Sequence, residues 1–154
     1  MGGDMLVERL VGLGLGIEAR DKADRPAVRV PREQLAAVAE RLRQDPELAF
    51  DLLLDHTGID WLAEARFELV YNLYSTQHGH YLTLTVLVPR DDPTVPTVSH
   101  VWPIAQWQER EVYDLLGVLY DDHPDLRRLF LEDGWQGFPL RKDYQDDDML
   151  ELPK

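Results

Sequence analysis

Two neighbouring apolar segments, residues 67–75 and 81–88, constrain the fold more than any other feature of the sequence. The first is FELVYNLYS and the second is YLTLTVLV, and both are rich in the β-branched and aromatic residues that favour strands. The second carries leucine or valine at every even position, which is typical of a strand with one buried face. The loop QHGH at residues 77–80 lies between them. We therefore predict an antiparallel hairpin at the centre of the fold.

Helical patterns occur at four places around this hairpin. Residues 5–11 suggest a short helix that ends at a run of glycines, and residues 35–42 carry apolar side chains at the i, i+3, i+4 and i+7 spacing of one buried face. A third helix is expected from Ser99, a possible N-cap, to Gly117. A fourth, short helix is expected to begin at His123, where a proline follows in the first turn.

Two further strands are expected before the hairpin, at residues 28–30 and 50–54. Between the second of these and the hairpin lies DHTGIDW, residues 55–61, whose composition predicts a turn-rich connection. His56 and Asp60 in this connection are candidate ligands, but ordinary polar turn residues are the simpler interpretation.

Length and composition indicate one globular domain spanning residues 1–154. No apolar run approaches the ~18–20 residues needed to span a bilayer, and the N-terminus lacks the basic region of a secretory signal, so we expect a soluble intracellular protein. The absence of cysteine excludes disulfides, a thiol nucleophile and a conventional iron–sulfur cluster. A net charge of −13 opposes binding to nucleic acid and direct binding to anionic lipid surfaces.

Several short motifs carry weaker functional signals. GLGLG at residues 12–16 lacks the flanking residues of a phosphate loop, so we interpret it as a flexible stop. His78 and His80 have no third ligand nearby, and an exposed hairpin tip is the simpler interpretation. The acidic residues 146–148 are expected to form a short solvated segment. A possible metal loop lacks the spacing and central glycine of a calcium site; its residues are Asp121, Asp122, His123 and Asp125.

The stretch from residue 109 to residue 144 concentrates charged groups among apolar ones, and we interpret the rest of the chain as its scaffold. It contains EREVYDLLG, DDHPDLRR and PLRKDY. A merely solvated face would not need so many apolar neighbours, and a plain core would not hold so many charges. These charges must therefore be neutralised by partners.

Glu111 is the most unusual of these groups. At ~100° per residue it projects between Ile104 and Trp107, within the predicted apolar arc of the helix, while Arg110 and Asp114 adjoin that arc. Three hypotheses follow: a pair with a cation of a partner subunit, a general acid or base with a raised pKa, and an internal ion pair. The candidates for the internal pair are Arg127, Arg128, Arg141 and Lys142.

No nucleophile, base and oxyanion-stabilising group form a recognisable arrangement, so the residues indicate an interaction surface. The alternative is a free-standing enzyme that uses Glu109, Glu111, Asp114 and His123 as acid/base groups or metal ligands. An enzyme of this kind needs a concave pocket with convergent polar groups, whereas a subunit needs paired charges and a docking patch.

The same segments resemble one known family, the C-type subunit of respiratory complex I, the proton-translocating NADH:quinone oxidoreductase. The matching motifs are the ERExYDLxG helix at 109–117, HPDLRR at 123–128, PLRKDY at 139–144 and a tryptophan-rich lead-in at 102–107. The resemblance assigns a set of residues to a motif at or behind a partner interface. They are Glu109, Arg110, Glu111, Tyr113, Asp114, Gly117, His123, Pro124, Asp125, Arg127, Arg128, Pro139, Arg141, Lys142 and Asp143.

The resemblance implies an α+β fold, in which a mostly antiparallel β-sheet packs with α-helices. It implies a subunit of the hydrophilic arm without a cofactor or catalytic residue of its own, while other subunits bind NADH, FMN, iron–sulfur clusters and quinone. The partners would be chiefly the hydrogenase-like D-type subunit and the B-type subunit, whose junction forms the quinone site. Such a subunit takes part in respiratory electron and proton transport on the cytoplasmic side of a prokaryotic cell membrane, as a peripheral component held only through the complex.

The sequence departs from the family pattern at two places. Phe138 stands where the family often has histidine, and Gln145 stands where a proline commonly follows the last aromatic residue. Related membrane-bound hydrogenases and other quinone oxidoreductases use similar subunits, so an equivalent position in one of those complexes is the alternative assignment.

Overall fold

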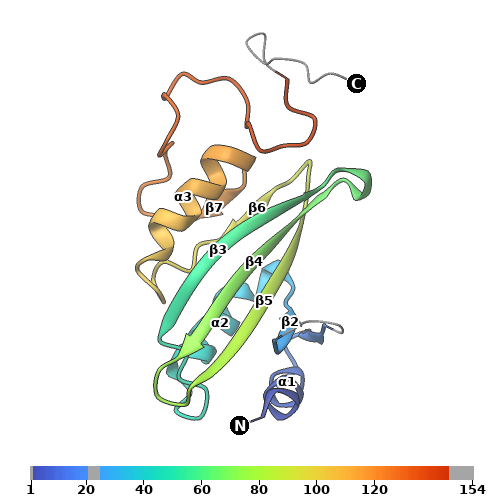
Figure 1. Cartoon of the computed structure of the whole chain (residues 1–154), viewed down its shortest axis with the longest axis vertical. Coiled ribbons are helices and arrows are strands. Elements are labelled where there is room, and N and C mark those ends of the chain that lie inside the picture. The colour runs from blue at the N-terminus through green and yellow to red at the C-terminus, as the bar shows by residue number, and fades with distance from the viewer. Residues whose placement is uncertain (1, 21–24, 146–154) are drawn as a thin grey trace.

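The computed structural model describes residues 2–20 and 25–145, and the acidic residues 146–148 lie outside these ranges. In this part of the chain, five strands form one sheet in the order β1-β2-β5-β4-β3, and two short strands, β6 and β7, pair separately (Figure 1). Only β2 and β5 pair in parallel within the larger sheet, so the predicted α+β class with a mostly antiparallel sheet is confirmed. The strands are β1 Glu18–Ala19, β2 Ala27–Arg29, β3 Leu52–Trp61, β4 Arg66–Ser75, β5 His80–Pro89, β6 Thr94–Pro96 and β7 Leu119–Asp121.

The predicted hairpin is present as β4 and β5, which pair over their whole length. The pairs Leu69–Val86 and Leu73–Leu82 are buried because every second residue of each strand faces the core. His80 belongs to β5 and is buried, with Nε2 2.9 Å from the carbonyl oxygen of Leu48, so the exposed-tip interpretation is wrong for this residue. His78 lies in the exposed loop, as expected.

The predicted turn at residues 55–61 is wrong, because these residues continue β3 along the edge of the sheet. The inward positions of this part of the strand are His56, Gly58 and Asp60, which a search for apolar alternation does not detect. A Cβ atom on Gly58 would lie 2.6 Å from Leu116 Cδ1, so the glycine allows a helix to pack directly on the strand.

Helices cover the core side of the sheet. They are α1 Gly3–Val11, α2 Leu35–Gln44 and α3 Ala105–Leu116, with short 3-10 turns η1 Arg32–Gln34 and η2 Leu62–Glu64. α2 buries the four apolar residues at the predicted spacing, and it lies behind the sheet in Figure 1. One cluster of buried apolar side chains joins all three helices to the strands, and this cluster is the hydrophobic core. Within the described ranges, no helix is long and apolar enough to cross a membrane.

α3 ends at Gly117, as predicted, where a left-handed φ of 81° closes the helix. Its predicted start at Ser99 is wrong, because turns occupy residues 99–104 and the helix begins at Ala105. The short helix expected from His123 is also absent: residues 122–145 form turns and bends that pass along α3 and over its C-terminal end (Figure 1). We call residues 122–145 the C-terminal segment.

Candidate functional site

α3 presents three different faces. One face packs on the core, and its residues are spaced four, three and four positions apart. A second face, beside the first, lies under the C-terminal segment. The third face is turned to solvent. The core face is Ala105, Glu109, Val112 and Leu116; the row under the C-terminal segment is Arg110 and Asp114; the outer face is Ile104, Trp107 and Glu111.

Glu111 is exposed, so its predicted position within a buried arc is wrong. The predicted arc contained Ile104, with Trp107 at its edge, whereas 51% and 50% of their surfaces are exposed. No basic residue of the described chain pairs with Glu111, which contradicts the hypothesis of an internal ion pair. The buried glutamate of α3 is Glu109 instead.

Glu109 ties α3 to the loop that precedes it. Its two carboxylate oxygens accept hydrogen bonds from the Thr97 hydroxyl and, at 2.9 Å, from the Val98 N–H. Burial raises the pKa of Glu109 to about 7, although these two hydrogen bonds act in the opposite direction. His123 Nε2 lies 3.9 Å away but donates its proton to the Gln106 carbonyl oxygen at 2.9 Å. Glu109 therefore titrates near neutral pH inside the protein.

Asp114 is the anchor for the start of the C-terminal segment. One carboxylate oxygen accepts the N–H groups of Leu129, Phe130 and Leu131 at 3.2, 2.6 and 3.2 Å, and the other accepts Arg128 Nη1 at 3.1 Å. Burial alone would raise the pKa of Asp114. The hydrogen bonds lower it by a larger amount, so the pKa of Asp114 lies below its usual range. Asp114 is thus an ionised carboxylate with its hydrogen-bonding capacity filled.

Two arginines complete this attachment. Arg110 donates from Nε and Nη2 to the carbonyl oxygens of Arg127 and Arg128, both at 3.1 Å, so it lies beside Asp114 without forming an ion pair with it. Arg128 also donates from Nη2 to the carbonyl oxygens of Trp135 and Gly137 at 3.0 and 2.9 Å. Together they fix a chain that has no regular secondary structure.

The PLRKDY motif closes over the end of α3. Arg141 Nε donates to the carbonyl oxygen of Leu116 at 2.7 Å, which satisfies one of the unpaired carbonyls at the helix end. The ring of Phe138 contacts two guanidinium groups, with its centroid 4.8 Å from that of Arg141 and 5.0 Å from that of Arg128. The pKa of Arg141 is lowered, chiefly by burial and in addition by the positive charge of Arg90. A Cβ on Gly117 would lie 2.6 Å from Arg141 and 2.7 Å from Phe138, so only glycine fits beneath them.

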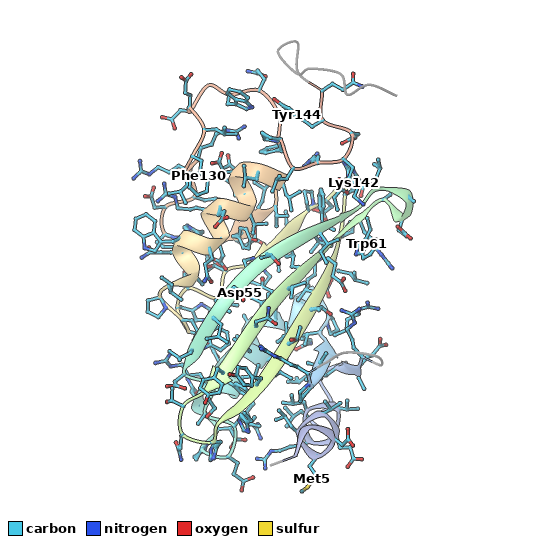
Figure 2. All side chains as sticks on the ribbon, viewed as in Figure 1. Met5, Asp55, Trp61, Phe130, Lys142 and Tyr144 are labelled. Atoms are coloured by element: carbon cyan, nitrogen blue, oxygen red, sulfur yellow. The ribbon has the colours of Figure 1, made fainter. Side chains whose placement is uncertain are left out.

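Asp60 holds the other end of this motif from the edge strand β3. It accepts a hydrogen bond from the backbone N–H of Lys142 at 2.8 Å and forms a buried ion pair with Arg90, which also pairs with Asp143. Figure 2 shows Lys142 close to Trp61, whose ring centroid lies 5.9 Å from the lysine nitrogen. The sequence did not indicate Arg90, because the loop that contains it has no periodicity.

His56 and Tyr120 form a second buried contact that the sequence did not predict. The Tyr120 hydroxyl lies 2.6 Å from His56 Nε2, and His56 Nδ1 lies 3.0 Å from the Val70 carbonyl oxygen. Because Nδ1 donates to that carbonyl, Nε2 accepts from the tyrosine. Burial lowers the pKa of His56 to about 4, so the ring is neutral. This contact attaches β7 to the sheet.

The HPDLRR motif begins with a turn at residues 124–125, which are exposed. The Asp125 N–H donates to His123 Nδ1 at 2.9 Å, and the Asp125 carboxylate pairs with Arg127 at the same distance. The Asp125 pair is exposed and contributes little to stability. Pro124 is exposed and Pro139 is half-buried, while the ring of Tyr113 meets that of Phe138 at 6.2 Å.

Of the four residues proposed for an enzyme, only Glu109 and His123 lie close together, and the His123 Nε2 proton is donated to the Gln106 carbonyl oxygen. Glu109 and Asp114 are buried on two faces of α3, and Glu111 points outward on a third. A groove of about 580 Å³ lies nearby, but none of these groups lines it. Its walls are Ala36, Pro96, Thr97, Ser99, His100, Asp121, Asp122 and Pro124. Among residues 2–20 and 25–145, no group of three or more His, Asp or Glu side chains is placed to hold a metal ion.

The fold and the site together define a class of protein: an α+β domain in which a charged motif attaches an irregular segment to one helix. Residues 28–149 match the family of the respiratory-chain NADH dehydrogenase 30 Kd subunit, and the chain belongs to this family. It is 41% identical over 140 residues to the C-type subunit of NADH-quinone oxidoreductase from Herpetosiphon aurantiacus, in an alignment that covers 83% of this chain and 82% of the relative. The resemblance to this component of complex I is therefore confirmed.

Solved structures share the fold, among them two that cover most of this chain. One is a chain in the membrane-bound sulfane sulfur reductase, an archaeal respiratory membrane complex, with a TM-score of 0.79 and 26% identity over 93% of this chain and 85% of that one. The other is the trypsin-resistant fragment of Nqo5, with a TM-score of 0.65 and 33% identity over 80% of this chain and 98% of the fragment.

Proposed function

We propose that this chain is a structural subunit of the hydrophilic arm of a proton-translocating NADH:quinone oxidoreductase and carries no cofactor itself. It docks on the D-type subunit, next to the B-type subunit, near the quinone site. It lies on the cytoplasmic side of the membrane and is held there only through the complex. NADH, FMN, iron–sulfur clusters and quinone bind to the other subunits.

The observation that carries this proposal is the use made of the charged family motif. Glu109, Arg110, Asp114, Arg128 and Arg141 all bond to the chain's own backbone or side chains. Groups held in this way fix the shape of a surface. A rigid surface with a fixed outline is what a subunit needs in order to dock in one orientation.

A second candidate function is the equivalent subunit of another respiratory membrane complex with a different electron donor. The structural similarity to a chain of the sulfane sulfur reductase, with a TM-score of 0.79, favours this candidate. The two candidates share the same role for this chain and differ only in the rest of the complex.

The proposal is tested by isolating the tagged chain from gently solubilised membranes of cells that contain the complex. We expect the D-type and B-type subunits to copurify, identified by mass, and the eluate to reduce a quinone with NADH. Copurification without NADH-dependent activity, but with another donor, would favour the second candidate. A chain recovered alone from such cells would refute both.

The same preparation tests whether the chain itself lacks a catalytic group. A Glu109→Gln variant removes the buried carboxylate whose pKa is raised to about 7, and Asp125→Asn serves as its exposed control. We expect both variants to assemble and to retain the quinone reductase turnover per complex. A large loss of turnover in assembled complexes with Glu109→Gln alone would contradict a purely structural role.

A further inference from the structure

The outer face of α3 is an exposed surface that the charged motif leaves unused. Ile104, Trp107 and Glu111 follow one another at intervals of three and four residues, so they lie along one side of the helix. Half of the surface of each apolar member is exposed. Phe130, on the C-terminal segment beside α3 (Figure 2), is 65% exposed. We call these four residues the outer patch.

Trp107 is held in place although it is exposed. The guanidinium of Arg110 lies 5.1 Å from the centroid of its ring. Arg110 is itself buried and fixed by the carbonyl oxygens of Arg127 and Arg128, so the contact is rigid. A side chain ordered in advance loses less entropy on binding, and tryptophan is among the residues that contribute most to interfaces.

Glu111 supplies the charge of the patch. The other three charged residues of α3 have hydrogen-bond or ion-pair partners, whereas Glu111 has none among the described residues. A carboxylate set among exposed apolar side chains favours a cation on any surface that covers them, because an unpaired charge is costly to bury. The net charge of −13 favours approach by a basic surface as well.

The open face of the sheet is the strongest competing surface. Trp61 and Tyr81 are exposed there. However, Glu68 on that face is already paired with Arg20 and Arg29, at 3.1 and 3.4 Å. The buried carboxylate of the sheet face is therefore already satisfied by arginines of the same face.

We propose that the outer patch docks on a neighbouring subunit through a segment that presents a lysine or arginine to Glu111 and an apolar pocket to Trp107. This inference rests on the proposed function and names the surface by which the chain would join the complex. It assigns Glu111 the partner cation that the sequence left open as one hypothesis. The buried contacts of Arg110 and Asp114 with the C-terminal segment then support the outer patch by holding that segment against α3.

The test uses matched variants of the tagged full-length chain, expressed in cells that contain the complex. Glu111→Lys and Trp107→Ala change the outer patch. Their controls are Glu8→Lys, an exposed glutamate on α1 at the other end of the molecule, and Trp61→Ala on the sheet face (Figure 1). We expect each outer-patch variant to recover at least about tenfold less partner subunit than the wild type, while the controls recover normal amounts. Circular dichroism of each purified variant establishes that it is folded.

The absence of cysteine allows a direct second measurement. A single Ile104→Cys or Glu8→Cys substitution gives this chain one thiol for a short thiol-to-amine crosslinker and leaves Glu111 and Trp107 in place. We expect Ile104→Cys to crosslink to a lysine of a neighbouring subunit in the assembled complex, and Glu8→Cys to yield no such product.

The outcomes separate the two proposals. If the wild-type chain copurifies with no other protein of the complex, the proposed function fails. If the wild type assembles and both outer-patch variants assemble equally well, the docking proposal fails and the function stands. A loss caused by Trp61→Ala alone would overturn the outer patch in favour of the sheet face.

Discussion

Replacement of Asp114 by alanine is the most informative perturbation of the buried motif. This carboxylate is fully buried and accepts three consecutive backbone N–H groups and the guanidinium of Arg128. The substitution removes all four bonds at once and leaves a nearly buried cation without its counter-charge. Residues 129–131 lose these backbone bonds to α3, while the hydrophobic core is not changed directly.

The expected cost follows from these contacts. Removal of one partner of a buried ion pair costs about 3–5 kcal/mol. Arg128 keeps three carbonyl acceptors, so we expect a value near the lower limit, about 3 kcal/mol. In a chain of this length, each kcal/mol lowers the melting temperature by about 2–4 °C, so the melting temperature should fall by about 6–12 °C.

Thermal unfolding followed by circular dichroism measures the change, and amide hydrogen exchange locates it. Protection should fall at the N–H groups of residues 129–131 before it falls in β4 and β5. Asp125→Ala is the control, because it removes an exposed carboxylate from the same motif, and it should leave the melting temperature unchanged. If Asp114→Ala melts with the wild type and keeps protection at residues 129–131, the anchoring role of Asp114 is refuted.

Three further predictions follow from the buried groups. Burial raises the pKa of Glu109 to about 7, so its contribution to stability is full below the ordinary pKa near 4.5 and is lost as pH rises through 7. In urea titrations the wild type should lose up to about 3 kcal/mol of unfolding free energy between pH 5 and pH 8, and Glu109→Gln should lose distinctly less. Equal pH dependence of the two proteins would refute this prediction. Gly117→Ala should destabilise the protein by about 2 kcal/mol or more, because residue 117 has a left-handed φ and its new Cβ would meet Phe138. Gly134→Ala, where a Cβ would meet no atom, should change the urea midpoint of unfolding little. Equal midpoints for the two variants would contradict the close contact at Gly117. Asp60→Ala should speed proteolytic cleavage within residues 139–145 without altering cleavage elsewhere, and an unchanged digestion pattern would show that Asp60 does not hold this end.

The parts of the fold that were predicted correctly have apolar residues at regular intervals. β4, β5 and α2 bury leucine, valine and phenylalanine at periods of two or about 3.6, and this pattern depends only on local sequence. β3 was missed over half its length because its inward residues there are histidine, glycine and aspartate. His56 is buried only because Tyr120 reaches it, and no local pattern contains that information.

The candidate site shows the same limit. The motif residues were found, but the helical pattern indicated Glu111 as the buried carboxylate where the structure buries Glu109. The sequence alone does not distinguish an apolar stripe that packs on the core from one exposed to solvent, and Trp107 belongs to the second kind. The partners of Glu109 and Asp114 lie in loops before and after the helix, so they could be assigned only after the chain was folded.

The attachment of the C-terminal segment to Asp114 has a consequence for synthesis of the protein. A ribosome makes the sheet and α3 before residues 128–141, so until then Asp114 is an unpaired charge at the side of its helix and the Leu116 carbonyl has no side-chain donor. When Arg128 emerges it pairs with Asp114, and when Arg141 emerges it donates a hydrogen bond to the Leu116 carbonyl oxygen. We therefore expect a chain that is cut short after α3 to be less stable than the whole chain, because it lacks both of these contacts.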